Sequence, residues 1–138
     1  MELIKLINGS PVPYTEAAFR ADNKHTVYGS VVPSRHLNAQ DVYRVTVKPK
    51  PVELGKVAVQ DALPALVDGV WTLGWSMRPM TELEARTLRN ELIAKTDWWA
   101  TSDRTMSQAE VDYRQALRDI PQQAGFPDNI TWPQEPTA

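Results

Sequence analysis

Residues 80–121 read MTELEARTLRNELIAKTDWWATSDRTMSQAEVDYRQALRDIP, and they contain neither glycine nor proline before Pro121. The whole chain of 138 residues has 11 prolines and 6 glycines, so most of these residues lie outside this stretch. Glycine and proline are the residues that most often interrupt helices and strands. Their uneven distribution predicts a helical region between Pro79 and Pro121, flanked by segments rich in turns.

Two helix starts can be recognised within this region. Thr81 precedes Glu84, and Ser107 precedes Glu110, by three residues each. This is the spacing of a capping box, in which the hydroxyl and the carboxylate each satisfy a free backbone N–H group at the start of a helix. A methionine precedes both boxes. The sequence therefore predicts a hairpin of two helices.

Apolar residues recur at helical spacing after each capping box. The positions are Ala85, Leu88, Leu92 and Trp99 in a first helix that runs to about Trp99, and Ala109, Tyr113, Ala116, Leu117 and Ile120 in a second helix that ends at Pro121. Glu110 and Arg114 have the spacing of a surface ion pair in the second helix.

The first part of the chain has the pattern of short strands. We expect strands over residues 2–7, 42–47, 56–63 and 70–77, with turns at Asn8-Gly9 and at Asp68-Gly69, the latter joining the last two strands. Thr15 can cap a short helix over 16–21. Trp71 and Trp75 fall on one face of the last strand, a surface that suits a core.

The final residues contain several prolines and three large apolar side chains, Phe126, Ile130 and Trp132. These side chains require burial, either on the hairpin or on another chain. The predicted fold class is α+β: a small N-terminal antiparallel β unit (1–79), a capped helical hairpin (80–121) and an extended Pro/Trp tail (122–138). No internal repeat and no low-complexity tract is recognised.

Composition excludes several classes of protein. The absence of cysteine removes disulfides and thiolate chemistry, and no apolar run approaches the ~20 residues of a membrane span. The N-terminus does not resemble a signal peptide, so we expect synthesis in the cytoplasm. The net charge of −2 argues against nucleic-acid binding. His25 and His36 lack metal-ligand spacing, so neither a metal nor a cofactor is expected.

The carboxylates of the second half also lack a catalytic arrangement. Asp97 and Asp103 flank the turn between the helices, and Asp119 lies at the end of the second helix. Caps and salt bridges explain such positions better than acid–base catalysis does. Trp98 and Trp99 are adjacent and point about 100° apart on a helix. One of them is therefore expected in the hairpin core, while the other meets the β unit or a partner.

The second half resembles the bacteriophage tail assembly chaperone family. The resemblance covers roughly residues 86–133, and its elements are Arg89 to Ile93, Thr96-Asp97-Trp98, Asp103, the run YRQALRDIP at 113–121, Phe126-Pro127 and Trp132-Pro133. Trp99 lies where family members vary. The pattern suits structural roles, and four of its residues, Trp98, Tyr113, Leu117 and Ile120, are expected to fill the centre of the hairpin.

The charged residues of the pattern can bridge the hairpin, with Asp97 and Asp103 meeting Arg114 or Arg118. Trp132-Pro133 can hold the tail over the helices. Four residues are candidates for binding a partner: Trp99, Phe126, Ile130 and Trp132.

The resemblance implies a non-enzymatic phage tail protein that binds tail-fibre or baseplate proteins, with no nucleic-acid or membrane partner. Such a chain is made in the host cytoplasm, belongs to a hetero-oligomeric assembly and stays in the virion tail as an adaptor or hinge, or else acts as a transient chaperone. An alternative is a receptor- or glycan-binding module that uses Trp71, Trp75 or Trp99 as stacking platforms. A third hypothesis, a glycan hydrolase, depends only on carboxylates that have structural explanations.

Overall fold

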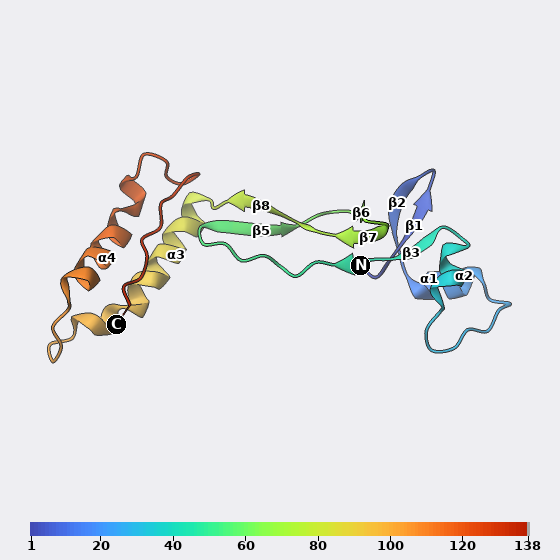
Figure 1. The fold of residues 1–138 in the computed structure, drawn as a ribbon, viewed down its shortest axis with the longest axis horizontal. Coiled ribbons are helices and arrows are strands. Elements are labelled where there is room, and N and C mark those ends of the chain that lie inside the picture. The colour runs from blue at the N-terminus through green and yellow to red at the C-terminus, as the bar shows by residue number, and fades with distance from the viewer. Residues whose placement is uncertain (138) are drawn as a thin grey trace. The chain divides into compact units, whose positions relative to one another are not determined.

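The computed structural model describes residues 1–137, and Ala138, the last residue of the predicted tail, lies outside the described residues. The chain forms two compact units (Figure 1). The first contains Met1–Pro51 and Ala58–Ser76, and the second contains Val52–Val57 and the residues from Met77 onward. Small sheets in the first unit and helices in both units make an α+β fold, which confirms the predicted class.

A three-stranded antiparallel sheet lies in the first unit. β1 (Leu3–Ile7) is its central strand, between β2 (Ser10–Tyr14) and β3 (Val42–Arg44). The helices α1 (Glu16–Asp22) and α2 (Ser34–Asn38) complete this part of the unit. Thr15 caps α1 as predicted, because its hydroxyl accepts from the Ala18 N–H at 3.1 Å. The buried core consists of Leu3, Phe19, Val32, Leu37 and Val42.

A second small sheet in the same unit has β7 (Val70–Leu73) at its centre. β4 (Thr46–Val47) pairs with it in parallel and β6 (Ala65–Val67) antiparallel. The turn at Asp68-Gly69 joins β6 to β7, and both residues have positive φ, 48° and 78°, as tight hairpin turns require. The predicted turn is therefore present, but its first strand is β6 and not the segment at 56–63.

The predicted strand over 70–77 is wrong as a single element. It divides at Gly74 into β7 and β8 (Trp75–Pro79), and β8 pairs with β5 (Lys56–Gln60) in a separate sheet. Gly74 is where another segment approaches closely. Its carbonyl accepts from the Asp61 N–H at 3.1 Å, and a side chain at this position would meet the Asp61 carboxylate at 2.8 Å. The predicted strand over 42–47 is likewise divided, between β3 and β4.

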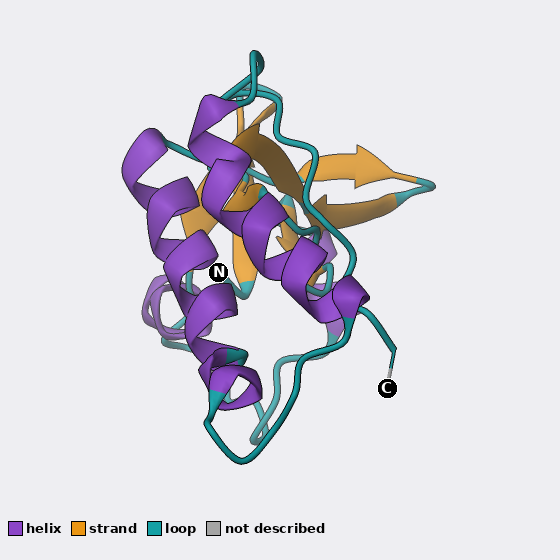
Figure 2. Cartoon of the chain, turned by 90° about the vertical axis from the view of Figure 1, so that its left-hand side faces the viewer, coloured by secondary structure: helices purple, strands orange, loops and turns teal. Residues whose placement is uncertain are grey.

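The second unit contains the helical hairpin. Its helices are α3 (Glu82–Lys95) and α4 (Gln108–Asp119), which lie side by side in Figure 2. Two 3₁₀ helices follow them, η1 (Asp97–Ala100) and η2 (Ile120–Gln122). Both capping boxes are complete, since the side chain and backbone bonds of Thr81/Glu84 and Ser107/Glu110 are all made. The first helix ends at Lys95, and not near Trp99 as predicted.

Candidate functional site: the helical hairpin and its C-terminal tail

The hairpin has a compact apolar core that the C-terminal tail (residues 123–137) completes. Four buried residues form the centre: Trp99, Tyr113, Leu117 and Ile120. Leu92, Ile93, Met106, Phe126, Ile130 and Trp132 pack around them. The last three of these come from the tail, which runs back along the two helices (Figure 1). The tail residues that needed burial therefore find it within this chain.

Arg114 links the second helix to the end of the first. Its Nη1 donates to the Thr96 hydroxyl at 2.7 Å and to the Ile93 carbonyl at 3.3 Å, while Nη2 donates to the Asp97 carboxylate at 3.0 Å. The Arg114 side chain is only 8% exposed, whereas that of Asp97 is 64% exposed. The expected pairing of Asp97 with Arg114 is thus present.

This contact satisfies the end of α3. The last carbonyls of a helix lack intrahelical donors and carry partial negative charge, so a buried cation there is favourable. Thr96 contributes as well, because its hydroxyl and its N–H both donate to the Ile93 carbonyl, at 2.8 and 2.9 Å. Arg114 and Thr96 therefore fix where α3 stops and where η1 begins.

Each capping-box glutamate has a second partner, an arginine six residues before it. Arg104 donates from both terminal nitrogens to the Glu110 carboxylate, at 2.6 and 3.1 Å. Arg78 does the same to Glu84, at 2.8 Å for both bonds. Two parallel bonds of this kind are stronger and more specific in direction than a single ion pair. They hold the chain that leads into each helix.

These bonds shift the pKa of both carboxyl groups. The hydrogen bonds from Arg78, followed by the bond from the Thr81 N–H, lower the pKa of Glu84 from 4.5 to about 2. The hydrogen bonds from Arg104 and from the Ser107 N–H also lower the pKa of Glu110. Both glutamates are therefore charged at neutral pH, and they serve as helix caps.

The expectation of no internal repeat missed a short one, which lies around the two helix starts. Residues 78–84 read RPMTELE and residues 104–110 read RTMSQAE. The shared pattern R-x-M-[S/T]-x-x-E extends each capping box by the arginine that binds its glutamate. This short repeat is a signal in the sequence that could have revealed the two Arg–Glu pairs.

The predicted ion pair between Glu110 and Arg114 is wrong. Arg104 binds Glu110, and Arg114 points to the end of α3 instead. The bidentate bond from Arg104 to Glu110 and the bond from Arg114 to the Ile93 carbonyl are both more favourable than a surface ion pair between Glu110 and Arg114. Such a surface pair contributes only about 0.3–0.5 kcal/mol.

The two adjacent tryptophans have the opposite roles from those predicted. Trp99, the candidate for partner binding, is 6% exposed and packs on Tyr113 with ring centroids 6.0 Å apart. Trp98, expected in the centre, is 58% exposed. The early end of α3 causes this exchange, because the 3₁₀ turn of η1 directs Trp99 into the core. Trp99 therefore belongs to the hairpin core of this chain.

Trp98 is exposed but held in place. Arg104 lies over its ring, 4.7 Å from the centroid, and Trp99 meets it edge-on at 6.2 Å. Because Arg104 is itself bound to Glu110, the Trp98 ring packs on an arginine whose position is held by an ion pair. We call the segment from Asp97 to Arg104 the hairpin tip. Two carboxylates on it, Asp97 and Asp103, are exposed.

Two further contacts order the C-terminal tail, one within it and one to the segment 52–57. The Gln123 side chain donates to the Thr131 carbonyl and accepts from the Thr131 N–H, both at 2.8 Å. The Trp132 indole lies against Gly55, where a Cβ atom would be 2.1 Å from its Nε1 atom. Gly55 has a φ of +81°, so both its backbone and its lack of a side chain suit this contact.

The remaining residues of the family pattern have smaller roles. Asp119 accepts from the Gln115 amide at 3.0 Å, and Pro121 lies in η2 directly after α4. Pro133 is half-buried beside Trp132. Within residues 1–137, Asp103 and Arg118 form no ion pair, so the expected bridge through them is not made.

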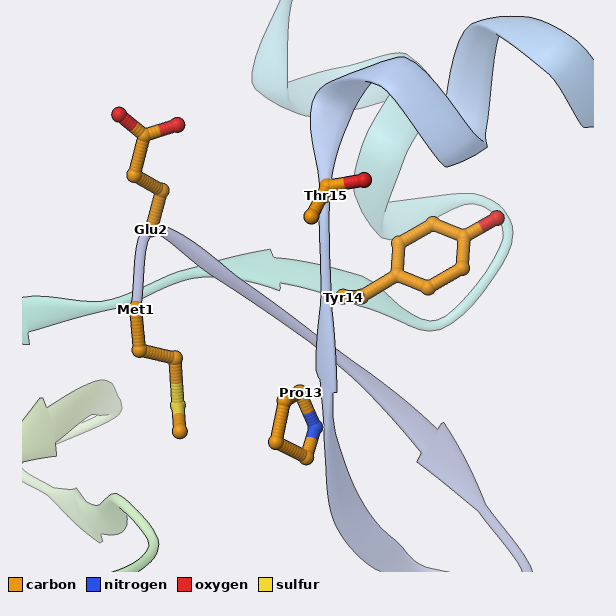
Figure 3. A pocket seen from close by; sticks show the side chains of 5 residues that line it. All are labelled: Met1, Glu2, Pro13, Tyr14 and Thr15. Atoms are coloured by element: carbon orange, nitrogen blue, oxygen red, sulfur yellow. The ribbon is translucent and has the colours of Figure 1, made fainter.

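A pocket in the first unit is lined by Met1, Glu2, Pro13, Tyr14 and Thr15 (Figure 3). The Tyr14 hydroxyl donates to Asp22, and burial together with that bond raises the pKa of Tyr14 to about 12, so the hydroxyl stays protonated at neutral pH. Residues 1–137 contain no group of acidic or histidine side chains that could hold a metal, and no helix long and apolar enough to cross a membrane.

Comparison with known proteins assigns the second unit. No curated protein and no solved structure matches the chain. The family model of the phage tail assembly chaperone protein matches residues 83–137, which supports a role in tail assembly. These residues span α3, α4 and the tail, the same elements that the shared core joins. The helical hairpin and its tail thus match the model of the phage tail assembly chaperone family, as the sequence pattern predicted.

Proposed function

We propose that this chain is a non-enzymatic phage tail protein that binds a tail-fibre or baseplate protein through the tip of its hairpin. The family match supports a role in tail assembly. The observation that carries the proposal is Trp98, a large aromatic residue that is 58% exposed and yet fixed by Arg104. Tryptophan is among the residues that contribute most to binding energy at protein interfaces.

The support of Trp98 favours binding. A side chain that is already ordered loses little conformational entropy when a partner covers it. Arg104 and Glu110 supply that order through the two hydrogen bonds described above. The tip is therefore arranged before any partner arrives.

The charge around Trp98 indicates the chemistry of the partner surface. Asp97 and Asp103 are exposed on the tip, while the positive charge of Arg104 is neutralised by Glu110. Residues 81–138 carry six basic and ten acidic side chains, a net charge of −4. The partner should therefore offer an apolar pocket with basic residues at its rim.

A pull-down of the neighbouring tail-fibre or baseplate protein tests this proposal. Trp98→Ala should weaken the affinity by about tenfold or more, as for a central interface residue. Leu83→Ala is the matched control, because Leu83 is also apolar and exposed (76%) but lies at the start of α3. Equal binding by the wild-type and Trp98→Ala chains would contradict the tip as the binding surface.

We further propose that the chain stays in the virion as a small adaptor or hinge. It consists of two compact units, so it has separate surfaces for two neighbours. Mass spectrometry of purified particles should detect the chain in stoichiometric amounts. Its absence from mature particles would leave a transient chaperone that acts only during assembly.

A further inference from the structure

A pocket of about 280 Å³ lies within the first unit. Its walls come from three places in the sequence: Ser34 and Asn38 in α2, Tyr43 and Arg44 in β3, and the turn that leads to Trp71 in β7. None of these residues belongs to the hairpin tip, so the proposed binding of a tail protein leaves the pocket without a role.

Two aromatic rings form the apolar part of the pocket. The Tyr43 and Trp71 rings are 6.4 Å apart between centroids, with an angle of 46° between their planes. Both side chains are half-buried. At this distance the two rings touch each other, so they form one continuous apolar wall on which a ligand can lie.

The polar lining offers both donors and acceptors. The Asn38 amide nitrogen can donate to the Ser34 and Val42 carbonyls, at 3.1 and 3.0 Å, which leaves its oxygen available as an acceptor. Within residues 1–137, the Tyr43 and Ser34 hydroxyls make no hydrogen bond. Hydroxyl groups can both donate and accept, so three uncommitted polar groups line one small pocket.

Arg44 adds donors but little net charge. Its Nη2 donates to the Val32 carbonyl at 2.7 Å and lies 3.7 Å from the Glu16 carboxylate. The remaining N–H groups of the guanidinium can still donate. Because Glu16 offsets the positive charge, the pocket suits a neutral ligand better than an anion.

From these features we infer that the pocket binds the ring of a neutral sugar. A pyranose has an apolar face of C–H groups, which fits the Tyr43 and Trp71 rings, and a rim of hydroxyls, which fits mixed donors and acceptors. Pockets for small molecules usually have volumes of about 300–1,000 Å³. A pocket just below this range holds one ring of a glycan, with the rest of the glycan in solvent.

An NMR titration of the ¹⁵N-labelled full chain tests the inference. The probes are methyl glucoside, N-acetylglucosamine and glucuronate at millimolar concentrations, with cyclohexanol as an apolar ring that has a single hydroxyl. At least one neutral sugar should cause saturable shifts at residues 34–44 and 69–71. Trp71→Leu should weaken binding about tenfold, Ser34→Ala by a smaller factor, and the control Trp98→Ala not at all.

Several outcomes would overturn the inference. They are the absence of saturable shifts with both neutral sugars, an equal response to cyclohexanol, and tighter binding of glucuronate than of either neutral sugar. If Trp71→Leu fails to fold, Ser34→Ala decides, and an unchanged affinity in that variant also overturns it. Loss of tail-protein binding by Trp98→Ala has no bearing on these results, so the two proposals fail separately.

Discussion

Arg114 and Asp97 form an ion pair of 3.0 Å in which one side chain is buried and the other is mostly in solvent. The arginine also binds the Thr96 hydroxyl and the Ile93 carbonyl at the end of α3. The pair is therefore asymmetric, since Arg114 is buried and has two further acceptors, whereas Asp97 is mostly solvated. Arg114 connects α4 to the point where α3 ends, and Asp97 is one of its three acceptors.

This asymmetry predicts unequal effects of two substitutions. Arg114→Ala removes the buried donor to the Thr96 hydroxyl and one of three donors to the Ile93 carbonyl, and it should lower the free energy of unfolding by about 3 kcal/mol. Asp97→Asn leaves the buried bonds of Arg114 intact and should cost less than about 1 kcal/mol. Urea unfolding followed by tryptophan fluorescence measures both. Similar losses for the two variants would show that Asp97, and not the helix end, is the main partner.

Alanine substitutions of the two adjacent tryptophans should also differ in their effect on the free energy of unfolding. Trp99→Ala creates a cavity in the hairpin core and should lower the free energy of unfolding by about 3–5 kcal/mol. Trp98→Ala removes an exposed ring and should cost less than about 1 kcal/mol. Thermal and urea unfolding of both variants provide the measurement. The reverse order would mean that Trp98 is the buried member of the pair.

Substitution of Gly55 tests how much the contact between the tail and residues 52–57 contributes to stability. Gly55→Ala introduces a side chain where the Trp132 indole lies, at a φ of +81°. Gly69→Ala is the matched control, because Gly69 has nearly the same φ (+78°) but no atom within 4 Å of the new Cβ atom. The backbone conformation alone should cost each variant about 1 kcal/mol or more.

The difference between the two glycine variants isolates the contact with Trp132. Gly55→Ala should be the more destabilised variant, and the indole N–H signal of Trp132 should move only in this variant. Equal losses of stability, with an unchanged Trp132 signal, would show that the tail does not rest on Gly55.

The capping-box glutamates predict an acid-sensitive hairpin. Glu84 has a pKa of about 2 in the folded chain, against an ordinary value of 4.5. As the pH falls below 4.5, the unfolded chain binds a proton at this carboxyl before the folded chain does. The stabilisation by Glu84 should therefore be complete above pH 4.5 and be lost progressively between about pH 4.5 and 2.

Unfolding free energies between pH 7 and pH 2 test this dependence. Glu84→Gln should be less stable at neutral pH and should show a smaller loss on acidification than the wild type. Arg78→Met, which removes the largest cause of the shift, should move the pKa of Glu84 back towards 4.5 in an NMR titration. A wild-type Glu84 that already titrates near 4.5 would contradict the bidentate pair.

Much of the hairpin is predictable because its signals act within a few residues. Thr81 with Glu84, and Ser107 with Glu110, cap their helices through bonds that span one turn, so both starts can be read from the chain. The same reason explains the correct helix cap at Thr15 and the turns at Asn8-Gly9 and Asp68-Gly69. The family pattern at 113–121 then identified the second half.

The strand pairing was less predictable. The alternation over 70–77 gives no sign that Gly74 divides it, because the cause is the approach of Asp61 from another segment. The pocket beside β3 and β7 has the same origin, since these strands bring Tyr43 next to Trp71. The alternation of apolar residues along a strand gives no information about which other segments will pack or pair with that strand.

The α+β class and the two capped helices follow from the amino-acid sequence, because local hydrogen bonds and turn residues are specified by neighbours in the chain, and the motif at 113–121 points to the family that residues 83–137 match. The folded structure was needed to show which of Trp98 and Trp99 is buried, and which acid each arginine binds. Those choices depend on where α3 ends, and Arg114, 18 residues beyond Thr96, fixes that end across the hairpin. Burial and ion pairing are decided by groups that meet only after the chain has folded.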